Sequence, residues 1–261
     1  MTNDTTPAPL AMTIDGAIAT VTFRRPEKSN AYNDAMLRGL DAGVRRAADD
    51  PAVRVLVLRG EGKHFCAGHD LTSEPDGEPT SGIGDVCLRL STLPKPTVAL
   101  VQGACIGGGM AFITCCDIII AAQNAFFSMP ETRIGFAPTP LIPFMLQALG
   151  ERNARRILMS GARFSADEAL RMGLVSDVCT PDGMEQILSA TLSSLLQAAP
   201  GAVATVKAQV ARLRNERPTT ELLASLQRGF DETWDSAEAN EGRAAMRAKR
   251  RLEGIREKRP A

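Results

Sequence analysis

The sequence predicts an α/β domain followed by an all-helical C-terminal region, and two observations support this. Up to about residue 140, short apolar runs rich in branched residues alternate with segments of helical spacing, as expected for strands joined by crossover helices. From residue 141 onward, helical periodicity dominates and a single strand-like run, 174–178, interrupts it. We therefore divide the 261-residue chain into a core, residues 1–200, and a C-terminal helical region, residues 201–261.

The first elements expected are a hairpin and a helix. Residues 10–23 alternate in places around Asp15-Gly16, a strong hairpin turn. Asn33 is a candidate N-cap for a helix that Pro51 ends. The rest of the core is expected to contain strands over 53–58, 97–101, 117–121 and 125–128 and helices over 86–93 and 108–114, with a polar surface loop over 72–84 of the kind that often covers a ligand site.

The remaining helices are expected to have broad apolar faces. Leu222, Leu223, Leu226 and Phe230 illustrate such a face, which suits packing against another subunit or against the core of the same chain. The expected helices cover 141–149, 152–160, 166–172, 184–198, 203–215, 220–234 and 237–256.

Composition argues against several classes of function. Lys plus Arg equals Asp plus Glu at 30 each, so no overall field favours nucleic acid or a membrane surface. The longest apolar run is interrupted by Asp117 before it reaches membrane-spanning length. The six cysteines lack metal-ligand spacing and only His64 and His69 could assist them, so we expect no metal site. Small core cysteines and a polar N-terminus without a signal-peptide pattern predict a cytoplasmic protein.

The basic stretch 243–259 has two interpretations. It contains Arg247, Lys249, Arg250, Arg251, Arg256, Lys258 and Arg259. It is either a solvated helix face or a contact for an anion such as a phosphorylated ligand.

Two loops are expected to present backbone N–H groups to one oxygen anion. The first donor loop is residues 65–71, in which Gly68 permits a sharp turn before His69. The second donor loop is residues 103–110, which opens a helix at Gly108 and so leaves N–H groups unpaired. The second loop lacks the Lys-Ser/Thr of a phosphate-binding P-loop and any clear acidic ribose partner. Close helix–strand packing is the alternative explanation for its glycines.

Glu131, directly after Pro130, is either a surface carboxylate in a turn or a catalytic base. Two amide donors and one carboxylate suit enolate chemistry on a thioester, which favours the base. The His69 imidazole has no partner identifiable by spacing, so we assign the function to its backbone N–H. Asp70 is expected to tie down the first donor loop by accepting N–H bonds. Cys66 and Cys105 are expected to be structural.

From about residue 14 to 251, these motifs in this order resemble the enoyl-CoA hydratase/isomerase superfamily, also called crotonases. The resemblance rests on Arg25-Pro26 through Asn30-Ala31, on 65–71, on 103–109 with Cys116-Asp117, on Pro130-Glu131 with Gly135, and on 149–161 and 166–175.

The resemblance implies a spiral of ββα turns, a helical trimerisation region, and homotrimers that often pair into homohexamers. It implies an acyl-CoA substrate, whose CoA is part of the substrate rather than a separate cofactor. The His69 and Gly108 N–H groups would hold the thioester oxygen and Glu131 would move the proton. Residues implied to contact the substrate are Lys28, Ser29, Ala31, Ala67, Gly68, Asp70, Leu71, Gly107, Pro130 and Thr139.

Two departures from the family pattern affect the expected activity. Ala111 stands where hydratases carry a second glutamate, and Thr139 stands where dienoyl-CoA isomerases and aryl-CoA dehalogenases carry an aspartate. Residues 135–143 look more like hydratases of branched, glutaconyl-type esters. The primary interpretation is an enoyl-CoA hydratase; the alternatives are a Δ3,Δ2-enoyl-CoA isomerase with Glu131 as single proton shuttle and a non-catalytic acyl-CoA-binding relative. Arg133 is either a contact for a substrate carboxylate or a surface arginine.

Overall fold

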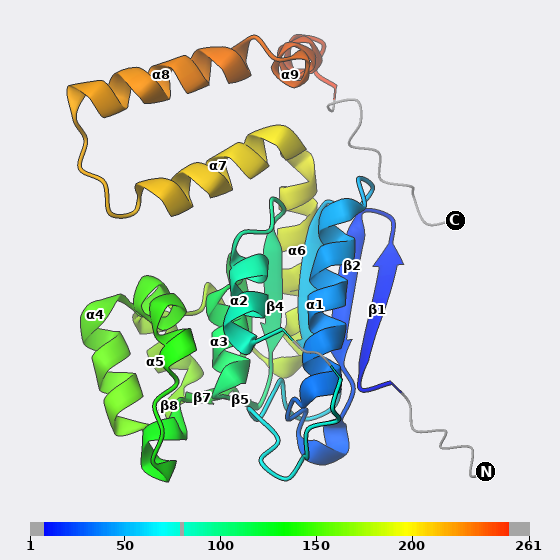
Figure 1. Ribbon diagram of the computed structural model, residues 1–261. Helices are drawn as coiled ribbons and strands as arrows, with labels where there is room; N and C mark the ends of the chain where they lie inside the picture. The colour runs from blue at the N-terminus through cyan, green and yellow to red at the C-terminus, as the bar shows by residue number, and fades with distance from the viewer. Residues whose placement is uncertain (1–7, 79–80, 251–261) are drawn as a thin grey trace.

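The computed structural model describes residues 8–78 and 81–250 and is built on a six-stranded sheet (Figure 1). The strand order is β1-β2-β3-β4-β6-β9, in which β1 and β2 form an antiparallel hairpin and the other neighbours are parallel. The strands are β1 (Leu10–Asp15), β2 (Ile18–Phe23), β3 (Val55–Gly60), β4 (Thr97–Val101), β6 (Ile118–Ala122) and β9 (Asp177–Cys179).

A second, smaller sheet lies beside the first and has the order β5-β7-β8. Its strands are β5 (Ala104–Ile106), β7 (Phe126–Ser128) and β8 (Phe164–Ser165). β5 and β7 are parallel, and they lead directly into the second donor loop's helix and into the Pro130-Glu131 turn. The small sheet therefore positions two of the three groups expected to carry the chemistry.

Helices cover both faces of the main sheet (Figure 1). One face packs against α1 (Asp34–Asp49), α2 (Ile83–Ser91) and α3 (Gly108–Thr114), and the opposite face packs against α6 (Met184–Gln197). Because strand side chains alternate, Leu56 and Leu58 enter the first core while Val55 and Val57 enter the second. A sheet buried on both faces explains the continuous apolar runs in the sequence.

The later helices are less buried. Figure 1 shows α7 above the sheet and α8 and α9 farthest from it. Their bounds are α7 (Pro200–Leu213), α8 (Thr220–Trp234) and α9 (Ala237–Arg247), preceded by α4 (Ile142–Ser160), which bends at Gly150, and α5 (Ala166–Arg171). Short 3₁₀ turns complete the chain: η1 (Pro26–Lys28), η2 (Pro130–Ile134), η3 (Thr139–Leu141) and η4 (Pro181–Gly183). Among the described residues, no single helix is long and apolar enough to span a membrane. Only the sharply bent pair formed by η4–α6 and α7 meets both requirements, by length and composition alone.

The predicted α/β fold is confirmed, with local differences. The Asn33 side chain caps α1 by accepting from the Met36 N–H, and α3 and α8 begin and end where expected. Residues 104–106 form a strand where a loop was expected. The predicted strand 174–178 is β9, three residues later at its start, because Leu174 and Val175 are buried in the turn that follows α5. The last helix ends at Arg247; its predicted extension to 256 lies mostly outside the described residues.

Candidate active site

The two donor loops lie side by side. The Cys66 N–H donates to the Ala104 carbonyl at 3.0 Å, and the Ile106 N–H donates back to the Cys66 carbonyl at 2.9 Å. Gly68 then approaches the second loop so closely that a Cβ on it would lie 3.1 Å from the Ile106 carbonyl oxygen. Backbone pairing of this kind fixes the two loops relative to each other without relying on side chains.

The first donor loop is also held from the N-terminal side. Asp70, 6% exposed, accepts from the Arg25 guanidinium at 2.8 Å and from the Thr72 N–H at 3.1 Å. Hydrogen bonds from the Thr72 hydroxyl and from Arg25 hold the pKa of the Asp70 carboxyl well below its usual range. The expectation that Asp70 ties down this loop is confirmed.

The turn after β2 joins the first donor loop through its backbone. Ser29 has φ +52°, and its carbonyl accepts from the Ala67 N–H at 3.0 Å. The Tyr32 N–H donates to the Gly68 carbonyl at 2.8 Å, and the Asp70 N–H donates to the Tyr32 carbonyl at 2.8 Å. Segment 28–32 and the first donor loop, both expected to contact the substrate, therefore form one continuous wall.

The glycines of the second donor loop are required by their surroundings. Gly107 has φ +54°, and a Cβ there would lie 2.7 Å from the Glu131 Oε1. A Cβ on Gly108 would lie 2.4 Å from the Tyr32 ring, and one on Gly109 would lie 2.7 Å from the Cys66 carbonyl oxygen. Close packing thus explains all three glycines, and it places Glu131 and Tyr32 directly against the loop.

The two N–H groups expected to act as donors have no protein acceptor. Within residues 8–78 and 81–250, no backbone carbonyl accepts from the His69 N–H or the Gly108 N–H. Gly108 is the first residue of α3, where an intrahelical acceptor is lacking by geometry. Both groups can therefore donate to a ligand.

Glu131 is the buried carboxylate of this cluster. It lies in η2 directly after β7 and is 8% exposed. Within the described part of the chain its Oε2 has no hydrogen-bond partner, although it is buried. Burial raises the pKa of the Glu131 carboxyl above its ordinary value. These properties exclude the surface-carboxylate interpretation.

Tyr32 is the site residue that the sequence analysis missed. It precedes the α1 N-cap and is far from Gly108 in sequence, so no motif pointed to it. The structure packs its ring against Phe112 and against the His69 imidazole, with ring centroids 5.5 and 5.2 Å apart. The only sequence signal was that it is the single tyrosine of the chain.

Other predicted residues lie at or beyond the margin of this cluster. Lys28 and Leu71 are exposed, the former 3.4 Å from the Thr72 hydroxyl. Pro130 begins η2, whereas Thr139 is exposed in η3, and in the described chain no hydrogen bond links its side chain to Glu131. Arg133 donates to the Ser160 carbonyl at 2.8 Å, which supports its structural interpretation.

The cysteines near the donor loops are buried and unreactive in character. Burial raises the pKa of the Cys66 thiol to about 12 and places that of Cys105 well above its usual range. The thiolate, which is the nucleophilic form, is disfavoured at both positions. Their structural interpretation is supported.

Comparison with known proteins agrees with this arrangement. Residues 13–253 match the family model described as enoyl-CoA hydratase/isomerase. The chain belongs to this family. It is 33% identical over 222 residues to (E)-benzylidenesuccinyl-CoA hydratase of Thauera aromatica, covering 80% of this chain and 84% of the relative. It is 31% identical to the short-chain-enoyl-CoA hydratase of Clostridium acetobutylicum, covering 93% and 95%.

Solved structures of family members share the fold. AtuE of Pseudomonas aeruginosa superposes with a TM-score of 0.87 at 34% identity, covering 95% of this chain and 100% of that chain. An enoyl-CoA hydratase of Shewanella pealeana gives a TM-score of 0.88 at 28% identity, covering 94% and 95%. The crotonase fold and the family are therefore established for this chain.

Proposed function

We propose that this protein is an enoyl-CoA hydratase, which adds water reversibly to a 2-enoyl-CoA. The observation that carries the proposal is Glu131, a buried carboxylate placed against the second donor loop. In the described residues, neither its Oε2 nor the Gly108 N–H of that loop has a hydrogen-bond partner. A buried carboxyl with a raised pKa is a stronger base than an exposed one once it is ionised. The hydratase names of several relatives support the same activity.

The reaction proceeds through a thioester enolate. Glu131 takes one proton from water as the water oxygen bonds to the β-carbon, and the displaced electron pair moves to the thioester oxygen. The N–H groups of His69 and Gly108 donate to that oxygen; loss of one such donor typically raises the barrier by about 3–4 kcal/mol. Glu131 then returns the proton to the α-carbon, which restores the carboxylate and completes a 3-hydroxyacyl-CoA.

The wall formed by segment 28–32 and the first donor loop is proposed to hold the CoA part of the substrate. Its exposed members, Lys28 and Leu71, frame the approach to His69. Lys28 provides a cation for a phosphate, and Leu71, 68% exposed, provides apolar surface. The basic stretch from 243 is a second candidate for phosphate contact. Within it, Arg250 pairs with Glu241, and residues 251–259 lie outside the described part.

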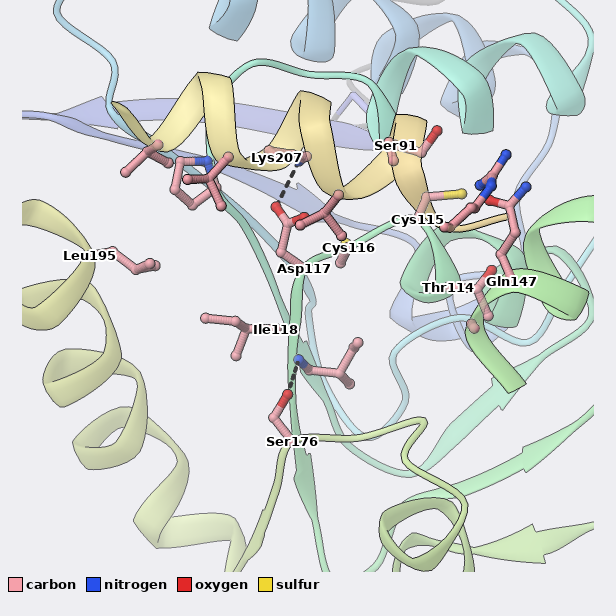
Figure 2. A pocket seen from close by; sticks show the side chains of 18 of the residues that line it. Ser91, Thr114, Cys115, Cys116, Asp117, Ile118, Gln147, Ser176, Leu195 and Lys207 are labelled. Carbon is pink, nitrogen blue, oxygen red and sulfur yellow. Dashed lines mark hydrogen bonds and ion pairs between the residues drawn. The ribbon is translucent and has the colours of Figure 1, made fainter. Parts of the chain in front are cut away.

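The C-terminal helices are proposed to join subunits into a homotrimer or homohexamer. A groove of about 830 Å³ lies between α7 and the core, and Glu131 is not among the residues that line it. Figure 2 shows this groove from close by. An ion pair between Lys207 and Asp117, 2.7 Å long, ties α7 to the start of β6. Beyond it, Val206 and Val210 are 62% and 67% exposed, which makes the groove wall apolar and open. A face of this kind suits contact with another subunit.

The proposed activity is tested by mass spectrometry of the purified protein incubated with 2-enoyl-, 3-enoyl- and 3-methylglutaconyl-CoA in heavy water. A product heavier by one water molecule supports hydration, and the preferred ester identifies the acyl group. Deuterium uptake with a shifted double bond and no added water would instead establish the isomerase, which one carboxylate suffices to catalyse. Binding without any change would overturn both activities in favour of an acyl-CoA-binding protein.

A further inference from the structure

The Tyr32 side chain is fixed in position beside the second donor loop. It is 9% exposed, and its ring is held between Phe112 and the His69 imidazole. A Cβ on Gly108 would lie 2.9 Å from the Tyr32 hydroxyl oxygen, just as a Cβ on Gly107 would lie 2.7 Å from the Glu131 Oε1. The phenol and the carboxylate therefore border adjacent residues of one loop.

The hydroxyl is free to bind a ligand. Within residues 8–78 and 81–250, no group hydrogen-bonds to it. The fully buried side-chain oxygen and nitrogen atoms without a partner in that part of the chain are Glu131 Oε2 and Arg89 Nη2. The Tyr32 hydroxyl also has no partner in the described residues, but it is not one of these two fully buried atoms. It therefore keeps some surface that is exposed to solvent.

The Tyr32 hydroxyl borders Gly108, in the first turn of the helix that also carries Ala111. Side chains on a helix lean toward its N-terminus, so one at position 111 would extend over the first turn of α3, toward Gly107 and Gly108. Ala111 is fully buried and too short to do so. The Tyr32 hydroxyl, by contrast, does border Gly108.

We propose that the Tyr32 hydroxyl is a further catalytic group, which holds the reacting water in place. Its oxygen accepts a hydrogen bond from the O–H of the water that Glu131 does not deprotonate. This role rests on the proposed hydratase function. The water oxygen forms a bond to the β-carbon, one of its protons passes through Glu131 to the α-carbon, and the other stays on the new hydroxyl group. Tyr32 keeps its own proton throughout. Burial, with smaller contributions from nearby thiols and Glu131, raises the pKa of the phenol, which therefore stays neutral.

The test compares Tyr32→Phe with the wild-type full chain in two reactions. The first is hydration of the preferred 2-enoyl-CoA. The second is exchange of the α-hydrogen of the matching saturated acyl-CoA in deuterium oxide, which needs Glu131 and the two N–H donors but no bound water. We expect kcat for hydration to fall roughly 10²-fold while KM and the exchange rate change by less than about twofold. Thr92→Val, which removes an exposed hydroxyl at the end of α2, should leave both reactions unchanged.

The possible outcomes separate this role from the activity itself. Equal hydration by Tyr32→Phe and wild type would overturn the role while leaving the hydratase intact. If hydration and exchange fell by the same factor, the proposed role of the hydroxyl would be wrong and Tyr32 would act only by packing its ring against its neighbours. The variant should then also have a lowered melting temperature. A wild-type protein that hydrates no ester would overturn the proposed function and this role together.

Discussion

The corner formed by the two donor loops and Glu131 is built differently from the C-terminal helices of this chain. At the corner, backbone hydrogen bonds join Cys66 to Ala104 and Ile106, and every residue from Gly107 to Ala111 is buried. In α7 and α8, by contrast, no described residue is buried, and Phe230 and Trp234 stack on each other while remaining about half exposed. The corner is held together by contacts within one chain, whereas the helices present surface that the described residues do not cover.

This difference indicates where substitutions act. Backbone pairing and close glycine contacts leave the corner little room to relax, so small changes there alter both geometry and chemistry. The helices are held by apolar side chains and partly exposed ion pairs, so we expect changes there to act on the proposed subunit contact instead.

The largest combined effect on stability and turnover is expected at Gly107. Gly107→Ala adds a Cβ that meets Glu131 Oε1 at 2.7 Å and places a side chain at φ +54°. We expect a stability loss of about 1–3 kcal/mol from the backbone and, because the carboxylate must move, a roughly 10²-fold loss of kcat. Gly16→Ala is the matched control, since Gly16 has φ +55° and nothing within 4 Å. If both variants lost only stability, the contact with Glu131 would be irrelevant to turnover.

A smaller effect, on stability, is expected at Asp70. A carboxyl whose pKa is lowered by folding contributes stability above its unfolded pKa of about 4, and this contribution is lost as the pH falls toward the folded pKa. The melting temperature of the wild type should therefore decrease once the pH is lowered below about 4. Asp70→Asn should be less stable than wild type at neutral pH, and its melting temperature should change less as the pH is lowered. Asp76→Asn, which breaks the more exposed pair with Arg38, is the comparison. Equal melting curves for the two variants at every pH would contradict the anchoring role of Asp70.

The smallest effect on the fold is expected in α7. Val206→Glu combined with Val210→Glu places charge on the exposed groove wall, where neither side chain contributes to the buried core. We expect analytical ultracentrifugation to show a lower oligomeric state while far-ultraviolet circular dichroism stays unchanged. If the wild-type protein sedimented as a monomer, that result would contradict the proposed subunit contact.

The same contrast explains what could be predicted from sequence. Hairpin, caps and helices rest on local signals such as Asp15-Gly16 and Asn33, and they were found close to their true bounds. The two loops and Glu131 were singled out by motifs that stand in a fixed order along the chain, and the structure brings these residues together. Tyr32 was missed because its proximity to Gly108 is created only when the turn after β2 docks on the first donor loop. The strand at 104–106 was missed because its partner, β7, is separated from it in the sequence by α3 and β6.

We propose that Glu131, in this corner, catalyses the addition of water to an enoyl-CoA. The most direct test is transfer of heavy oxygen from labelled water into a 2-enoyl-CoA by wild type and by Glu131→Gln, with folding monitored by melting temperature. We expect a labelled 3-hydroxyacyl-CoA from wild type, formed more slowly as the pH falls through the raised pKa of Glu131. In the folded variant we expect a loss of about 10³-fold or more. Undiminished incorporation by Glu131→Gln, or none by wild type, would contradict it.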